Sequence, residues 1–428
     1  MSAGSINPSR RFSRDVAWTL ATRLLMIVNS VAAGIIVAHW LGAEGVGKLA
    51  VINVAVTTIV QLGSFGLPSS NTYFISQDRA HFRAATINSL LFATVIGFVL
   101  ALALSVVASF RPDWFGFVPP ELIRIAAISI PFQLVTLIGL NILLAVGKIR
   151  EFNLLDLVAQ SFVLINALVV LIVFGLGLVS LVKLNTATSV LVSIVIAVLL
   201  VSAGRSLLDS RWRADAALLR RMITYGLKFH ISVLAGAIIF RADLLVVNLI
   251  RGPAEAGVYS VATQFSLLLM LLPGVIATLL FPRVTAEQDK YGETTWVVTR
   301  HTALIMLACC LAAVPFSFLL PLVYGQAFSE ATGLLLILLP GVYLVGLESV
   351  LVQHFNALGL PRTIPVYWLV TLVVNLVLVF ALVPQFGAYG AAIASTVSYA
   401  LIFALVAFYF YATTRRTVPA TARGSLRG

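Results

Sequence analysis

The chain has 428 residues, of which 60% are hydrophobic and only 10% are charged. An ordinary soluble domain carries about 25% charged residues, whereas twelve membrane helices of about 20 residues each would use roughly 240 residues of apolar character. These proportions exclude a soluble globule and a long disordered chain, so we treat the whole chain as one multi-pass membrane unit. The net charge is +12. The basic residues must first be assigned to the loops between helices before this charge is interpreted as a sign of nucleic-acid binding.

Apolar segments long enough to cross a bilayer recur along the chain and predict twelve helices. The first six are expected at 17–40, 49–68, 89–110, 122–146, 154–176 and 184–204. The last six are expected at 228–250, 257–281, 301–323, 332–355, 364–383 and 388–411. Open sheets cannot span lipid because their unpaired backbone groups are costly there, and the alternating strands of a barrel are absent. The predicted fold is therefore an all-α polytopic bundle.

The basic residues predict the orientation of this bundle. Of the 28 lysines and arginines, 21 fall in the tails and loops on the side of the N-terminus and 5 on the opposite side, while Arg23 and Arg241 lie within helices. Lysine and arginine are enriched in cytoplasmic loops, so both termini are expected in the cytoplasm. Basic side chains facing anionic headgroups also account for the net charge, and we expect membrane lipids and no nucleic acid as partners.

The two halves of the sequence share an internal repeat. The matching pairs are Gly42 with Gly252, Gly47 with Gly257, Gly177 with Gly387 and Thr186 with Thr396 at an offset of 210, and Gly147 with Gly359 and Arg150 with Arg362 at 212. Each half holds six helices, an even number, so the repeat is parallel and related by an axis along the membrane normal. Transporters with such halves move a substrate at the interface between them.

The helices and the repeat divide the chain into five predicted regions. The N-terminal lobe covers 17–206 and the C-terminal lobe 228–411. A cytoplasmic N-tail, an inter-lobe linker and a basic cytoplasmic C-tail are expected at 1–16, 207–227 and 412–428. Two such lobes would surround a central cavity that opens alternately to either side of the membrane.

Three stretches carry a resemblance to a known family. They are VAHWLGAEGVGKLAVINVAVTTIVQLGSFGLPSSNTY from Val37 to Tyr73, RADLLVVNLIRGPAEAGVYSVATQFSLLLMLLPGVIATLLFPRV from Arg241 to Val284, and FGAYGAAIASTVSY from Phe386 to Tyr399. They resemble polysaccharide biosynthesis proteins of the O-antigen flippase type, in the superfamily that also includes multidrug-and-toxin extrusion antiporters and lipid II flippases. The resemblance covers about residues 12–411, and its spread-out glycines are more specific for the superfamily than for a substrate.

The resemblance implies a fold, a cargo and a location. It implies two six-helix lobes around a V-shaped cavity in the bacterial inner membrane. The cargo it implies is an undecaprenyl-pyrophosphate-linked oligosaccharide, moved from the cytoplasmic to the outer leaflet for cell-surface polysaccharide synthesis. Glycan polymerases or transferases are then expected partners, and proton or sodium coupling an expected driving force. The family's lipid II flippases have two extra helices, for which this chain has no room.

Arginine and asparagine within the helices are the candidate substrate-binding residues. A charge at the bilayer centre is costly and usually faces a cavity, and Arg241 is predicted near the middle of its helix. A guanidinium matches phosphate oxygens geometrically, so Arg241 is a candidate for attracting a pyrophosphate or an acidic sugar in the central cavity. The alternative is an interhelical ion pair that fixes the packing of the lobes. Arg23 either guards the cytoplasmic entrance or extends to the headgroups. Asn29 either contacts sugar or joins helices by a hydrogen bond.

Three carboxylates are candidates for ion coupling, and four basic residues for the cytoplasmic mouth. Asp243, Glu348 and Asp156 lie in predicted helices, where each is either a proton or sodium site or a structural group. Arg79, Arg83, Lys148 and Arg150 rim the predicted mouth, where they satisfy the inside-positive bias and steer an anionic headgroup.

The sequence carries no motif for catalysis, metal binding or ATP hydrolysis. The five histidines show no H-E-x-x-H spacing, no G-x-x-x-x-G-K-[ST] occurs, and Cys309 and Cys310 are adjacent within an apolar stretch. We therefore expect a transporter without cofactors rather than an enzyme. The main alternative is a cation-coupled multidrug antiporter, which would need acidic groups in its cavity. A membrane glycosyl-transferring enzyme would need a sizeable outer loop, which the predicted helices leave no room for.

Overall fold

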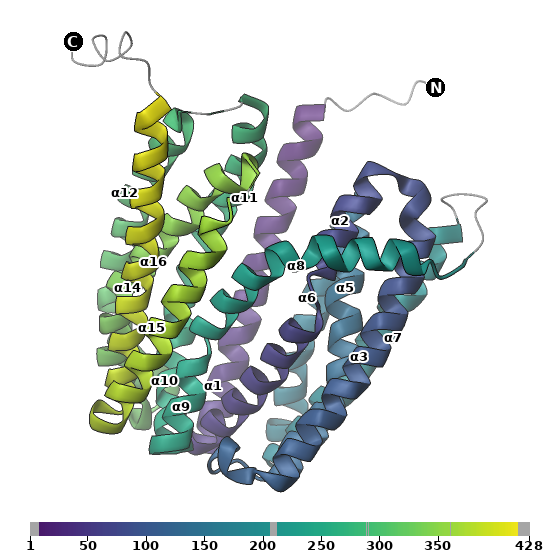
Figure 1. Cartoon of the computed structure of the whole chain (residues 1–428). Coiled ribbons are helices and arrows are strands. Elements are labelled where there is room, and N and C mark those ends of the chain that lie inside the picture. Colours follow the sequence, from purple (N-terminus) through teal and green to yellow (C-terminus); the bar gives the residue numbers. More distant parts are fainter. Residues whose placement is uncertain (1–7, 206–211, 288, 290, 360, 418–428) are drawn as a thin grey trace. The chain divides into compact units, whose positions relative to one another are not determined.

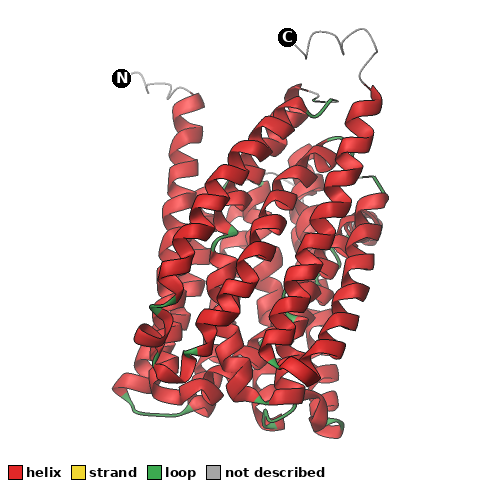
Figure 2. Ribbon diagram, turned by 90° about the vertical axis from the view of Figure 1, so that its left-hand side faces the viewer, coloured by secondary structure: helices red, strands yellow, loops and turns green. Residues whose placement is uncertain are grey.

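The computed structural model describes residues 8–205, 212–287, 289, 291–359 and 361–417. Within these ranges every regular element is a helix and none is a strand (Figure 2). Residues 1–7 of the predicted N-tail, 206–211 at the predicted linker and 418–428 of the predicted C-tail lie outside the described residues. By their contacts the residues form two units, the N-terminal unit (Met1–Leu234) and the C-terminal unit (Ala235–Gly428).

The N-terminal unit is built around α5, which packs against five neighbouring helices of that unit. Its helices are α1 (Pro8–Gly63), α2 (Leu67–Gln77), α3 (Phe82–Phe110), α4 (Pro120–Ala127), α5 (Ile130–Ala145), α6 (Ile149–Ala167) and α7 (Leu178–Arg205). Its shorter elements are η1 (Arg79–His81), η2 (Pro112–Phe115) and the π-helical turn η3 (Leu168–Val173). Because α5 is surrounded by helices, it is apolar nearly all round, as buried helices are.

A long helix, α8 (Ala216–Ile239), leads from the first unit into the second (Figure 1). Part of the predicted linker is thus helical, and its beginning packs within the N-terminal unit. There the Ser70 hydroxyl donates to the carbonyl of Met222 over 2.5 Å, and the rings of Tyr73 and Tyr225 stack 4.2 Å apart. After Gly63 the chain continues as α2, a separate helix with Pro68 in its first turn.

The C-terminal unit is built around α14, which packs against α10, α11, α12 and α16. Its helices are α9 (Ala242–Arg251), α10 (Pro253–Leu268), α11 (Leu271–Glu287), α12 (Glu293–Ser317), α13 (Leu320–Tyr324), α14 (Glu330–Ala357), α15 (Thr363–Phe386) and α16 (Ala388–Thr417), with the turn η4 (Gln326–Phe328) between α13 and α14. Tyr399 and Ile402 of α16 join Val342 and Val345 of α14 in its apolar core.

The helices agree with a multi-pass membrane protein. In the described part of the chain, ten helical segments are long and apolar enough to cross a bilayer, or eleven when the bent pair α4 and α5 counts as one span. One segment, Trp18–Gly63, has 46 residues and is broken at Gly42. One crossing needs only about 20 residues, so this segment supplies two of the predicted twelve spans.

Five of the predicted helices are interrupted rather than continuous. The helix expected at 122–146 bends by 41° between α4 and α5, because Pro131 in the first turn of α5 has no N–H to continue the preceding helix. The helix expected at 228–250 breaks between α8 and α9 at Arg241, where φ is −140°. The helices expected at 49–68, 257–281 and 301–323 are interrupted between α1 and α2, between α10 and α11, and between α12 and α13, respectively.

Backbone geometry agrees with the internal repeat inside each unit. Gly42 has φ 65° and ψ −174°, and Gly252 has φ 96° and ψ 173°, a conformation that a residue with a Cβ rarely adopts. The offset of 212 also relates α14 to α4 and α5 together, so the central helices of the two units are repeat-related. Gly177 and Gly387 each directly precede a helix, but the left-handed glycine before α7 is Gly175.

The threonines matched by the repeat make the same tertiary contact in both units. Thr186 Oγ1 donates to the carbonyl of Ile125 over 3.3 Å, and Thr396 Oγ1 donates to the carbonyl of Ile337 over 2.7 Å. The threonines are 210 residues apart and the carbonyls 212, the two offsets found from the glycines. Each contact ties the central helix of a unit to the last helix of the repeat.

Candidate functional site

A buried carboxylate, Asp243, sits inside the C-terminal unit with hydroxyl partners. Its Oδ2 accepts hydrogen bonds from the hydroxyl of Tyr259 and from Ser395 Oγ, the latter over 2.7 Å, while its Oδ1 accepts from the N–H of Leu244. The side chain is 1% exposed. We call Asp243, Tyr259 and Ser395 the carboxylate cluster. Sequence reasoning found Asp243 but not its two partners, which lie 16 and 152 residues further along the chain.

Arg241 lies two residues before Asp243, at the break between α8 and α9. It occupies the N-cap position of α9, and its side chain is exposed whereas Asp243 is buried. The apolar segment His230–Arg251 places Arg241 near its middle, as predicted, but at a helix end rather than inside a continuous helix. The N-terminus of a helix carries partial positive charge, so the break adds to the positive potential around the guanidinium.

Glu348 is a second buried carboxylate of the C-terminal unit. It lies on α14, its side chain is 2% exposed, and its Oε1 has no hydrogen-bond partner among the described residues. On the same helix, the buried His354 also has an unpartnered ring nitrogen, Nδ1. An unsatisfied buried polar atom costs about 1–3 kcal/mol, so this helix contains groups that packing alone does not account for.

The remaining candidates within the helices of the N-terminal unit form a polar seam between α1 and α6. Arg23 Nη1 lies 3.1 Å from Asp156 Oδ2. Asn29 Nδ2 donates to Ser161 Oγ over 2.8 Å, and Asn153 Nδ2 donates to Thr19 Oγ1 over the same distance. The seam thus joins the substrate candidates Arg23 and Asn29 to α6, and it pairs Arg23 with the ion-coupling candidate Asp156.

The four basic residues predicted at the cytoplasmic mouth are placed differently from one another. Arg83 donates from Nε and Nη2 to the carbonyl of Gly204, near the end of α7, and its guanidinium lies 5.6 Å from the ring centroid of Trp212. Lys148 Nζ lies 3.8 Å from a carboxylate oxygen of Glu151. Arg79 and Arg150 have exposed side chains. Arg83 therefore has a structural role at the end of a helix.

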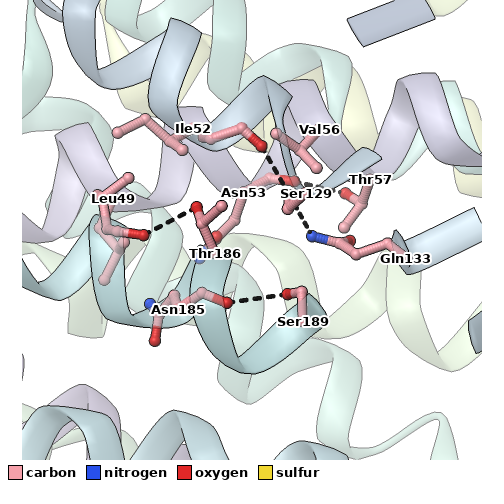
Figure 3. A pocket seen from close by; sticks show the side chains of 12 residues that line it. Leu49, Ile52, Asn53, Val56, Thr57, Ser129, Gln133, Asn185, Thr186 and Ser189 are labelled. Carbon is pink, nitrogen blue, oxygen red and sulfur yellow. Dashed lines mark hydrogen bonds between the residues drawn. The ribbon is translucent and has the colours of Figure 1, made fainter. Parts of the chain in front are cut away.

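A hollow of about 80 Å³ lies within the N-terminal unit, and no sequence motif predicted it. We call it the polar hollow (Figure 3). Its lining comes from α1, α4, α5 and α7 and consists of Leu49, Ile52, Asn53, Val56, Thr57, Ala126, Ser129, Gln133, Val182, Asn185, Thr186 and Ser189. Amide and hydroxyl side chains inside otherwise apolar segments were the available signal, since such groups in membrane helices usually face other protein groups or water.

The described residues hold no group of three or more His, Cys, Asp or Glu side chains arranged for a metal ion. The two cysteines are free thiols.

Comparisons with known proteins identify the family to which the chain is similar. The family model described as polysaccharide biosynthesis protein matches residues 14–288. A protein of Haloferax volcanii named probable low-salt glycan biosynthesis flippase Agl15 is 23% identical over 196 residues, covering 44% of this chain and 42% of that protein. Another protein of that organism, named probable flippase AglR, is 27% identical over 168 residues, covering 37% and 35%. The matches thus span less than half of either relative.

Solved structures with the same fold extend over nearly the whole chain. The lipid II flippase MurJ in an inward closed conformation superposes with a TM-score of 0.77 at 14% identity, covering 93% of this chain and 87% of that one. An inward-facing multidrug resistance MATE family transporter of the MOP superfamily superposes with a TM-score of 0.73 at 14% identity, covering 94% and 100%. At this identity the likeness establishes the fold, and the polytopic all-helical prediction is confirmed.

Proposed function

The chain belongs to the polysaccharide biosynthesis protein family, and we propose that it is a flippase for a polyprenyl-pyrophosphate-linked oligosaccharide. In this proposal the cargo moves from the cytoplasmic to the outer leaflet by alternating access, with undecaprenyl as the polyprenyl group. The sugars and the pyrophosphate cannot cross hydrocarbon unaided, whereas the polyprenyl tail stays in lipid. The names of the two Haloferax relatives support a glycan flippase.

The observation that carries the proposal is an exposed arginine at a helix break within an apolar segment. Arg241 caps the N-terminus of α9, so a fixed positive charge and the positive end of a helix coincide. Discontinuous helices in transporters direct such N-termini at anionic substrate groups. A guanidinium binds phosphate through paired hydrogen bonds, and Arg241 is proposed to contact the pyrophosphate. Arg23 and Asn29 are proposed to contact the cargo from α1, and Arg79 and Arg150 to attract its headgroup at the mouth.

The placement of the carboxylates favours this cargo over a cationic drug. Asp243 and Glu348 are buried inside the C-terminal unit, and Asp156 is paired with Arg23. None of the three therefore presents an unpaired carboxylate to a cation in solution, as an extruder of cationic drugs would require. The structural likeness to MATE transporters is what supports that alternative.

The same carboxylates are proposed to couple transport to a proton or sodium gradient. Glu348 has an unpartnered oxygen in an apolar surrounding, which a proton would neutralise. Asp243 already has three donors, so protonation or cation binding there would have to displace one of them. We propose a bacterial inner membrane location with both termini in the cytoplasm, in agreement with the distribution of basic residues. Glycan polymerases or transferases are the proposed partners.

Leaflet exchange in liposomes tests the proposal. The purified protein would be reconstituted with a fluorescent prenyl-pyrophosphate oligosaccharide, and the fraction accessible to a membrane-impermeant quencher would be followed over time. We expect the wild type to accelerate exchange and Arg241→Ala to slow it by about tenfold or more, since hydrogen bonds to charged groups contribute about 1.5–3 kcal/mol. Arg241→Lys should be intermediate, because an ammonium lacks the paired donors.

Arg251 offers a matched control at the other end of α9. Its Nε lies 3.1 Å from Glu255 Oε2 in an exposed pair, so Arg251→Ala should leave exchange within about twofold of wild type. Equal exchange rates for wild type and a folded Arg241→Ala protein would remove Arg241 from the mechanism. Exchange of a cationic dye, with none of the glycan lipid, would favour the drug extruder.

A further inference from the structure

The polar hollow has the chemistry of a binding site rather than of a packing defect. Seven of its twelve lining residues carry amide or hydroxyl groups, five are apolar and none is charged. A defect in a membrane helix bundle would be lined by apolar groups, because an unsatisfied polar group in hydrocarbon is costly. The hollow also lies wholly within the N-terminal unit, so its shape depends on that unit alone.

Three amide side chains at the hollow have hydrogen-bonding capacity that the protein leaves unused. The Asn53 amide makes no hydrogen bond to a described residue, since only its backbone carbonyl accepts one, from Thr57. Asn185 uses its Oδ1 to accept from Asn166, which leaves its NH₂ group. Gln133 uses Nε2 to donate to Ser129 Oγ over 2.9 Å, which leaves its Oε1. Donors and acceptors are thus both available to a ligand.

The hollow sits where the central helix of the N-terminal unit is broken. Ser129 lies between α4 and α5, and its N–H donates to the carbonyl of Ala126 instead of continuing the helical pattern from Ile125. The freed carbonyl of Ile125 accepts from Thr186, another lining residue. The labelled side chains of α1, α5 and α7 gather around this point (Figure 3). Breaks of this kind occur in transporters where the backbone lines a substrate site.

Size and charge restrict what the hollow can hold. A water molecule needs about 10–15 Å³ of such volume, so a hollow of about 80 Å³ holds several waters, or one compact polar ring in their place. The absence of any charged lining residue disfavours a phosphate, a carboxylate or an alkali cation as the ligand. A group that both donates and accepts hydrogen bonds, with apolar C–H faces to set against Leu49, Ile52 and Val56, fits best.

We propose that the polar hollow binds one uncharged sugar ring of the cargo, through Asn53, Gln133 and Asn185. The proposal rests on the proposed flippase function, because the cargo is what supplies the sugar. The N-terminal unit would thus bind the glycan through uncharged hydrogen-bonding groups, whereas Arg241 would bind the charged pyrophosphate. A neutral sugar would be held and an acidic one rejected, since no cation in the lining would offset a buried carboxylate.

Saturation-transfer NMR on the full chain in lipid nanodiscs tests this site without any transport step. Nanodiscs avoid maltoside and glucoside detergents, whose sugar headgroups would compete. The probes are methyl glucoside, methyl galactoside and N-acetylglucosamine as neutral rings, and glucuronate as the acidic one. We expect at least one neutral ring to show saturation transfer at millimolar concentration and glucuronate to show none. In the double variant Gln133→Leu with Asn185→Leu, binding of that ring should weaken by about tenfold.

Two further variants keep the outcome clear. Asn141→Leu also removes an amide from α5, but Asn141 donates to the carbonyl of Leu137 and does not line the hollow, so binding should be unchanged. Should the double variant fail to fold, Asn53→Ala removes one exposed amide without disturbing packing and should weaken binding by about threefold. The proposal is overturned if no neutral ring binds the wild type, or if the hollow variants bind as the wild type does.

These measurements are independent of the flippase assay. Sugar binding that depends on the hollow, together with absent leaflet exchange, would refute the proposed function and keep the site. If the wild type accelerates leaflet exchange but the hollow variants bind sugars as the wild type does, the proposed function would stand and the proposed sugar site would be refuted.

Discussion

The polar hollow of the N-terminal unit and the carboxylate cluster of the C-terminal unit occupy repeat-related positions but carry different side chains. At an offset of 210, Leu49 corresponds to Tyr259, Asn185 to Ser395 and Ser189 to Tyr399. In the C-terminal unit the two tyrosines are buried and Tyr259 donates to Asp243. In the N-terminal unit the smaller side chains leave space. Two buried tyrosines of the C-terminal unit thus stand where the N-terminal unit has the smaller Leu49 and Ser189.

The difference shows that the repeat preserves backbone contacts while allowing the interior to diverge. The threonine ties from Thr186 and Thr396 and the left-handed glycines at 42 and 252 are present in both units. The counterpart of Asp243 is Ala33, which is buried in an apolar cluster with Val37 and Leu171. One scaffold therefore holds an uncharged hollow in one unit and a buried acid in the other, consistent with the separate roles proposed for them.

Exchanging Ala33 and Asp243, which occupy equivalent positions in the repeat, should have the largest effect on stability. Ala33→Asp places a carboxylate among apolar side chains with no hydroxyl partner, and we expect it to destabilise the N-terminal unit by about 4 kcal/mol or more. The reverse change, Asp243→Ala, leaves the hydroxyls of Tyr259 and Ser395 without their acceptor and should cost about 2–4 kcal/mol. Unfolding in mixed micelles, followed by circular dichroism, measures both.

The control for this exchange is Asp243→Asn, which keeps an acceptor oxygen. It should cost about half as much as Asp243→Ala if hydrogen bonding to Tyr259 and Ser395 is what makes the carboxylate structural. An Ala33→Asp protein as stable as the wild type would mean that polar groups or water reach Ala33, and the contrast between the two interiors would then be wrong.

Glu348 should behave in the opposite direction from Asp243, because it has an unpartnered oxygen. Replacing it with leucine removes a buried polar group and adds apolar volume, so Glu348→Leu should stabilise the C-terminal unit by about 1–3 kcal/mol. If Glu348 couples transport to an ion gradient, the same variant should lose the acceleration of leaflet exchange by an imposed gradient. A destabilised variant would show instead that the carboxylate has partners that hold the fold.

The two threonine ties should differ in strength although the repeat preserves both. Thr396→Val removes a hydrogen bond of 2.7 Å and should cost about 1 kcal/mol. Thr186→Val removes a contact of 3.3 Å at a broken helix and should cost less than about 0.5 kcal/mol. Denaturant titration of the two single variants measures the difference. Equal costs would mean that the break between α4 and α5 does not weaken the tie of the N-terminal unit.

The parts of the fold that sequence could predict are those set by composition and by glycine. The length of the apolar segments predicts the membrane helices. The offsets of Gly42 and Gly147 from their partner glycines predict an internal repeat, and the paired glycines all have positive φ in the structure. The helix break at Arg241 was not predicted, whereas Pro131 marks the bend beside Ser129. Apolar length is unchanged by a bend, and Arg241 has no nearby proline to mark one.

The candidate site was predictable only one residue at a time. Charge inside an apolar segment singles out Asp243 and Arg241, but the partners of Asp243 come from helices far along the chain, and their hydroxyls are common residue types. The polar hollow depends on what is missing from the packing of four helices, and no single-residue signal encodes an empty volume. Tyr259 and Tyr399 show this most clearly, because these large buried side chains stand where Leu49 and Ser189 line the hollow.

The pair of Arg23 and Asp156 should have the smallest effect on stability and can separate a structural role from a binding role. The Arg23 side chain is 40% exposed, and such pairs contribute about 0–1 kcal/mol, so Arg23→Gln and Asp156→Asn should each change the unfolding free energy by less than about 1 kcal/mol. A charge swap, Arg23→Asp with Asp156→Arg, should restore the pair and its small stabilisation. If Arg23 contacts the cargo, the swap should still slow leaflet exchange, because the guanidinium has moved from α1 to α6. A swap that restores both stability and exchange would mean that Arg23 acts only through the ion pair.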